Sequence, residues 1–257
     1  MNNVWKTIFF SFLMINAAFA FAGKTRLKVQ DGGSYISGTL TLSTGSKVKF
    51  EVDMPYKDLT TVRYSSGDAV ISGEINTIDG TVSITGESAQ SGLALAANKS
   101  NKILFKDILT GFQIKSAKFK RKLKDNPRAM EGVGYLFKMT EYMTMLPENT
   151  SLNLLIKKPV ATAGWTDLCR YYGKSRTAKW DVGSNKKQRS YKVGGHGWCA
   201  GRCGAGCIWF GDPQYSQDCL NHDACADREG KQLGVCGDEW TAASDDFWFS
   251  PDCPGVD

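Results

Sequence analysis

The sequence predicts an α+β protein, in which a β-rich, sandwich-like or barrel-like domain is followed by a disulfide-bonded, mainly α domain. From Lys24 to about Lys124, short stretches such as 47–52 alternate polar and apolar residues between Gly, Asp, Ser and Asn turns. All eight cysteines lie between Cys169 and Cys253. In an exported chain, an even number of cysteines indicates up to four disulfides.

This segregation divides the chain into a signal peptide at residues 1–22, a β-rich domain at 23–158 and a cysteine-rich domain at 159–257. The first segment has Lys6 ahead of an apolar run and small residues suited to cleavage, which is typical of a secretory signal. Its apolar run is shorter than the ~20 residues that span a bilayer. The sequence therefore predicts secretion, either to the periplasm or to the cell exterior.

Within the β-rich domain, two segments resemble each other, 36–38 and 71–73, each of which is Ile-Ser-Gly. Two copies favour repeated hairpins over a solenoid, which needs at least three repeats. Asn126 as an N-cap, followed by proline, predicts a helix over 127–146, and residues 152–156 are expected to form a last strand. We expect no chemistry from this domain, because it has no histidine and its carboxylates are scattered among lysines.

Basic residues account for a formal net charge of +6, and many of them cluster in 115–124 and 170–192. These clusters are either ordinary solvated faces or attraction sites for anionic lipid headgroups, each basic residue near such a surface contributing ~1 kcal/mol. Nucleic acid is not an expected partner, since no RNA-binding motif, zinc finger or helix-turn-helix pattern accompanies the charge. If these clusters do attract a partner, we expect it to be an anionic phospholipid membrane surface.

One of the only two histidines lies in the segment 218–227, Asp-Cys-Leu-Asn-His-Asp-Ala-Cys-Ala-Asp. On a helix, His222 shares a face with two cysteines and Asp223 lies about 100° further round the axis. Two disulfides could therefore hold this helix on either side of the histidine. Upstream, the glycine-rich loop 201–207 lets backbone carbonyls turn toward a common point, which suits the oxygen cage that calcium prefers.

These residues resemble the secreted phospholipase A2 family, whose signature is Cys-x-x-His-Asp-x-Cys on a helix, preceded by a calcium loop with Cys-Gly-x-Gly. Cys203 and Cys219 reproduce the family's interval of 16 residues (219 − 203) between these two motifs. The resemblance covers about 199–253 and is closer to the short bacterial and fungal members. It implies a disulfide between Cys203 and Cys219.

The resemblance also implies a calcium site and a base. Asp223 would bind Ca²⁺ through its carboxylate, together with the main-chain carbonyls of Arg202, Gly204 and Gly206. His222 would take a proton from the water that attacks the glycerol ester. Calcium would polarise the ester carbonyl and stabilise the developing oxyanion.

An aspartate from the following predicted helix, 238–247, would hold the histidine in the right tautomer. The candidates are Asp246, Asp245 and Asp238. On a helical wheel Asp246 lies closer to the inward apolar stripe than Asp245, so the wheel favours Asp246. Antiparallel pairing of the two helices is expected to bring residues 242–246 beside His222.

Three positions depart from the family pattern: Asp218 replaces a cysteine, and Arg202 and Ala226 replace tyrosines. None of them removes a catalytic atom. The sequence therefore predicts a secreted, calcium-dependent phospholipase A2-like esterase that hydrolyses the sn-2 ester of glycerophospholipids. The alternative is a catalytically inactive relative that binds membranes or serves adhesion. A zinc site at His196 and His222 is disfavoured, since oxidised cysteines offer no thiolate.

Overall fold

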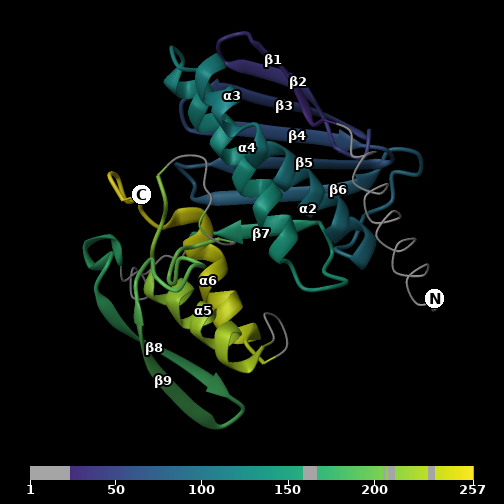
Figure 1. Cartoon of the computed structure of the whole chain (residues 1–257). Helices are drawn as coiled ribbons and strands as arrows, with labels where there is room; N and C mark the ends of the chain where they lie inside the picture. Colours follow the sequence, from purple (N-terminus) through teal and green to yellow (C-terminus); the bar gives the residue numbers. More distant parts are fainter. Residues whose placement is uncertain (1–23, 159–166, 205–206, 208–211, 231–234, 257) are drawn as a thin grey trace, which may run out of the picture.

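The computed structural model describes residues 24–158, 167–204, 207, 212–230 and 235–256 (Figure 1). The predicted signal peptide and the first residues after the domain boundary predicted at 158/159 therefore lie outside the described residues. Among the helices of the described part, none is long and apolar enough to cross a membrane.

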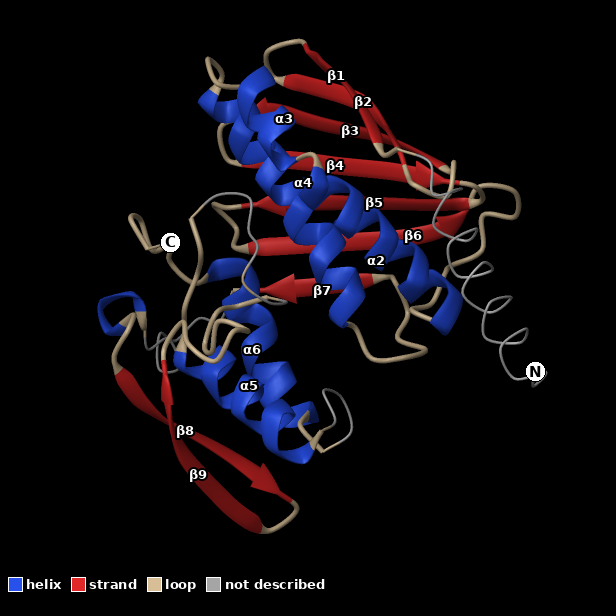
Figure 2. Cartoon of the chain, in the orientation of Figure 1, coloured by secondary structure: helices blue, strands red, loops and turns tan. Residues whose placement is uncertain are grey.

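A seven-stranded antiparallel sheet forms most of the N-terminal region, with its strands in the order β1-β2-β3-β4-β5-β6-β7. The strands are β1 Arg26–Asp31, β2 Tyr35–Thr41, β3 Lys47–Tyr56, β4 Leu59–Ser66, β5 Ala69–Asn76, β6 Thr81–Ser88 and β7 Leu154–Lys157. Helices lie across one face of this single sheet (Figure 2). The expected sandwich or barrel is therefore wrong, because helices, not a second layer of strands, bury the apolar face.

Three helices cover the sheet: α2 Lys99–Ile114, α3 Ser116–Lys122 and α4 Pro127–Met145. The prediction of a helix over 127–146 is confirmed, and the Asn126 side chain accepts a hydrogen bond of 3.0 Å from the Ala129 N–H. The expectation of strands as far as Lys124 is wrong after Ser88. There, Phe105 begins a buried row at helical spacing that continues through residues 108, 109 and 112.

The two similar segments occupy equivalent positions in the sheet. Residues 36–38 lie in β2 and residues 71–73 in β5, and each strand leads into a hairpin. Gly45 and Gly80 lie in the following turns with φ of 88° and 60°. These left-handed turns require glycine, so the similarity reflects two related hairpins of one sheet.

The cysteine-rich region consists of a β-hairpin and two packed helices. Its elements are η2 Cys169–Tyr171, β8 Ser175–Val182, β9 Asn185–Lys192, α5 Gln217–Glu229 and α6 Gly237–Phe249. The four disulfides are Cys169–Cys253, Cys199–Cys207, Cys203–Cys219 and Cys225–Cys236. All eight cysteines are thus paired, which confirms the expected disulfide count and the Cys203–Cys219 bridge. Four disulfides are typical of an oxidising, extracellular-type environment.

Helix α4 joins the two regions, because one hydrophobic cluster continues from the sheet through α4 into α6. The Tyr142 ring lies 5.9 Å from Trp240, 5.5 Å from Phe247 and 5.5 Å from Trp248, between centroids. One turn earlier, the buried Lys138 amine donates to the Trp248 carbonyl at 3.2 Å and to the Gln214 side chain at 2.8 Å. The cysteine-rich region is therefore packed against the N-terminal helices by apolar and polar contacts.

Candidate functional site

Helix α5 carries the His-Asp pair, as the sequence predicts. Its N-cap is Ser216, whose hydroxyl accepts a hydrogen bond of 3.0 Å from the Cys219 N–H, and it ends at Gly230 with φ 65°. The disulfides of Cys219 and Cys225 hold α5 on either side of the histidine, as expected. This double attachment fixes the helix against the glycine loop and against α6.

His222 is largely buried, with 14% of its side chain exposed. Its Nδ1 lies 4.0 Å from Oδ1 of Asp223, which is too long for a hydrogen bond. The Trp240 ring of α6 lies 5.5 Å from the imidazole, between centroids. His222 and Asp223, although adjacent on α5, thus have different surroundings, as different roles would require.

Asp223 is oriented by the loop that precedes α5. The Gly201 N–H donates to Oδ2 of Asp223 at 2.8 Å. Burial raises the pKa of this carboxyl well above its usual range, while the Gly201 hydrogen bond and the Arg202 charge oppose the rise. The Asp223 side chain is 20% exposed, and a carboxylate that is desolvated to this extent at a cavity fits a cation ligand, because a bound cation would stabilise its charge.

The loop itself has the backbone conformation of a turn that needs glycine. Gly201 and Gly204 have φ of 82° and 126°. Arg202 and Gly204 line the same cavity as Asp223 and His222. The third predicted carbonyl donor, Gly206, lies outside the described residues, so the full calcium ligand set stays a prediction.

Arg202 brings an unexpected residue into the site, Glu141 of α4. Nη2 of Arg202 lies 3.5 Å from Oε1 of Glu141, and the two side chains are only 1% and 2% exposed. A Cβ added to Gly204 would lie 2.6 Å from the same oxygen, so the loop passes directly over the glutamate. The expectation that the N-terminal carboxylates lie on an ordinary surface is therefore wrong for Glu141. The signal in the sequence that could have indicated a buried Glu141 is its position among the apolar residues of α4, Met139, Tyr142 and Met143.

The register of α5 against α6 differs from the expected one, centred on residue 244, by about one helical turn. Trp240 lies opposite His222, whereas Asp246 is fully buried near Ser216, at the start of α5. Burial raises the pKa of Asp246 to about 7, with the Ser216 hydroxyl opposing the rise. The role of Asp246, Asp245 or Asp238 in orienting the His222 imidazole stays a prediction.

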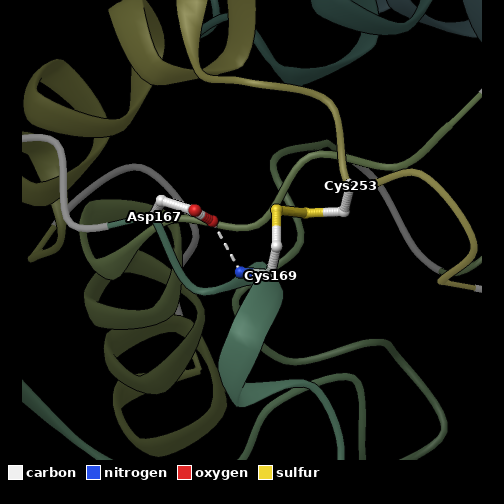
Figure 3. A group of neighbouring side chains, drawn as sticks. All are labelled: Asp167, Cys169 and Cys253. Carbon is white, nitrogen blue, oxygen red and sulfur yellow. Dashed lines mark hydrogen bonds between the residues drawn. A yellow bond between two sulfur atoms is a disulfide. The ribbon is translucent and has the colours of Figure 1, made fainter.

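A separate cluster of possible metal ligands, Asp167, Cys169 and Cys253, has a structural role (Figure 3). The two cysteines form a disulfide and offer no thiolate. Oδ1 of Asp167 accepts a hydrogen bond of 2.6 Å from the Cys169 N–H. His196 is exposed, and its ring stacks on Trp198 at 5.6 Å between centroids. Because all eight cysteines are in disulfides, no thiolate is available for the disfavoured zinc site.

A cavity of about 850 Å³ opens beside His222 and Asp223. Its lining comes from the loop before α5, from α5 and α6, and from α2 and α4 of the N-terminal region. This volume is typical of a site for a small organic ligand. The His-Asp pair therefore belongs to the lining of a cavity to which both regions contribute.

A comparison with protein families finds one match, to a domain of unknown function (DUF8213) over residues 150–253. The matched part includes β7 as well as the cysteine-rich region, so it reaches into the N-terminal sheet. No curated protein and no solved structure matches the chain.

Proposed function

We propose that this protein is a secreted, calcium-dependent phospholipase A2-like esterase that hydrolyses the sn-2 ester of glycerophospholipids. The observation that carries the proposal is the Cys203–Cys219 disulfide, which holds the glycine loop against α5. The Gly201 N–H of this loop donates a hydrogen bond to Asp223, and both Asp223 and His222 line the cavity. A base, a candidate cation ligand and an open cavity for a substrate thus occur together.

The charges of the site also favour a bound cation. With Asp223 ionised, Asp223 and Asp227 face Arg202 and Lys106 in the cavity lining, and Glu141 adds a third negative charge beside Arg202. Glu141 neutralises the guanidinium, which would otherwise repel a divalent ion beside Asp223. Calcium prefers such carboxylate and backbone oxygens.

In this mechanism, His222 accepts a proton from the attacking water and returns it to the leaving alcohol. Asp223 and the carbonyls of Arg202 and Gly204 would hold the calcium ion. When bound, that ion supplies Lewis-acid polarisation of the ester carbonyl. The surrounding Trp240 and Phe247 side chains would limit the access of bulk water to the ester.

The first test is fatty-acid release from vesicles of defined phospholipids by the mature protein, with calcium or with excess chelator. We expect sn-2 hydrolysis only with calcium. His222→Gln should lower turnover at least ~10²-fold and leave calcium affinity unchanged, since it removes only the base. Asp223→Asn should lower both calcium affinity and activity. His196→Gln is the matched control, because this second histidine is exposed and should change neither quantity.

A membrane-binding protein without turnover is the second candidate, favoured by the exposed basic hairpin β8–β9. It predicts vesicle binding with no fatty acid released under any calcium concentration. Equal activity in chelator, or full activity of His222→Gln, would instead refute the proposed chemistry altogether.

A further inference from the structure

Part of the lining of the cavity that contains His222 comes from the N-terminal region. Helix α2 contributes Lys106 and Leu109, and α4 contributes Met145. Leu109 is buried, Met145 is half-buried and Lys106 is exposed. The region in which the sequence shows no catalytic motif therefore supplies part of the lining of the space next to the base.

The chemistry of this space suits one kind of ligand. Leu109 and Met145 of the N-terminal region and Trp240 and Phe247 of the cysteine-rich region all line it. Binding an alkyl chain between such side chains removes apolar surface from water on both partners. Lys106 adds a cation to the same cavity, which suits the phosphate of a headgroup.

This part of the lining is held in place by contacts between the two regions. Tyr142 of α4 stacks on Trp240 with an interplanar angle of 27°, and Lys138 donates to the Trp248 carbonyl at 3.2 Å. The Glu141–Arg202 ion pair joins α4 to the glycine loop. Side chains on such fixed elements select a ligand by its shape.

We propose that α2 and α4 form the binding wall for the sn-2 acyl chain, so that the N-terminal region determines acyl-chain selectivity. The inference rests on the proposed function, because the acyl chain is placed by the ester at His222. It goes beyond the His-Asp motif, since Leu109 and Met145 lie outside the cysteine-rich region. Both are specificity determinants and not catalytic residues.

The test uses two readouts: binding of a short-chain phospholipid with an ether in place of the sn-2 ester, and fatty-acid release from vesicles of mixed acyl length. Met145→Trp narrows the cavity and should weaken binding of the ether lipid about tenfold, with calcium affinity unchanged. Met145→Ala and Leu109→Ala widen it and should shift release toward longer chains. Ile114→Trp is the matched control, because Ile114 is 60% exposed on α2 and is not among the cavity residues.

The outcomes separate this inference from the proposed function. Hydrolysis whose chain-length profile is unchanged in all the cavity variants would overturn the inference and leave the proposed function intact. Binding of the ether lipid that depends on Met145, with no hydrolysis in the parent protein, would support the binding wall and refute the esterase. Thermal unfolding of each variant shows whether a loss of lipid binding comes from misfolding. If Met145→Trp is misfolded, the chain-length profiles of Met145→Ala and Leu109→Ala decide whether the inference holds.

Discussion

Replacing Glu141 by glutamine tests whether the N-terminal region is energetically part of the site. The variant keeps the shape of the side chain and removes its charge, so the buried Arg202 loses its ionic partner. Nη2 of Arg202 and Oε1 of Glu141 are 3.5 Å apart, and the side chains are 1% and 2% exposed. Breaking a buried pair of this kind costs about 3–5 kcal/mol, mainly because the remaining charge stays desolvated.

For a chain of this size, each kcal/mol lowers Tm by about 2–4 °C, so Glu141→Gln should lower Tm by roughly 6–20 °C. Calorimetry or circular dichroism measures this shift directly. Asp125→Asn is the matched control, because the Lys124–Asp125 pair is 70% and 88% exposed and is worth less than about 1 kcal/mol. A Glu141→Gln shift no larger than that of the control would refute the reasoning.

A double variant tests the mechanism of the loss. Adding Arg202→Met to Glu141→Gln removes the buried positive charge that lost its Glu141 contact and should restore much of the lost stability, which a double-mutant cycle quantifies. Glu141→Gln alone should also weaken calcium binding, because the Arg202 charge then acts on the cation without compensation. Equal calcium affinity in parent and single variant would separate the ion pair from the metal site.

Two further predictions concern surface and buried lysines. Lys187 donates a hydrogen bond of 2.8 Å to Glu229, so charge reversal at Lys186 is the cleaner change in the β8–β9 hairpin. This change should weaken binding to phosphatidylglycerol vesicles more than binding to phosphatidylcholine vesicles, by up to about tenfold. An equal loss on both lipids, or the same loss from Lys47→Glu, would mean that the hairpin is only a solvated surface. Burial lowers the pKa of Lys138 from 10.5 to about 8. The unfolded chain therefore binds more protons between about pH 8 and 10.5, so the free energy of unfolding of the parent should rise with pH relative to Lys138→Met, by about 3 kcal/mol over the window. A pH-independent difference in denaturant unfolding would contradict this.

Local signals in the sequence predicted individual elements correctly. Asn126 followed by proline sets the start of α4, and alternation with glycine turns sets the hairpins as far as Ser88. The interval between Cys203 and Cys219, read through the family resemblance, gave the disulfide that closes the loop on α5. In each case the determining residues lie close together in the sequence or at a fixed interval.

The architecture could not be predicted in the same way. Alternation shows that one face of a sheet is apolar, but it does not show whether helices or another sheet covers that face. Helix α2 has its own signal in Phe105, Ile108 and Phe112, which repeat at helical spacing. The prediction of a β-rich region as far as Lys124 extended the alternation seen before Ser88 over this helical pattern.

The site failed to follow from the sequence where it depends on contacts across the chain. Glu141 and Arg202 are separated by 61 residues, and no spacing rule links them. The helical wheel gave the face of α6 but not its axial position. In the structure the Cys225–Cys236 disulfide links α5 to the residue before α6, and Trp240 lies beside His222.

A chain of aromatic contacts makes the histidine sensitive to the N-terminal region. Tyr142 stacks on Trp240, and Trp240 lies 5.5 Å from the His222 ring. Because Tyr142 belongs to the helix that also packs on the sheet, a shift of α4 would be transmitted to the imidazole through two ring contacts. The same helix neutralises Arg202 and provides Met145 to the cavity. The Cys203–Cys219 disulfide thus joins the loop to α5, while α4 contributes the ring packing on Trp240, the charge of Glu141 and Met145 of the cavity, so both regions contribute to the candidate site.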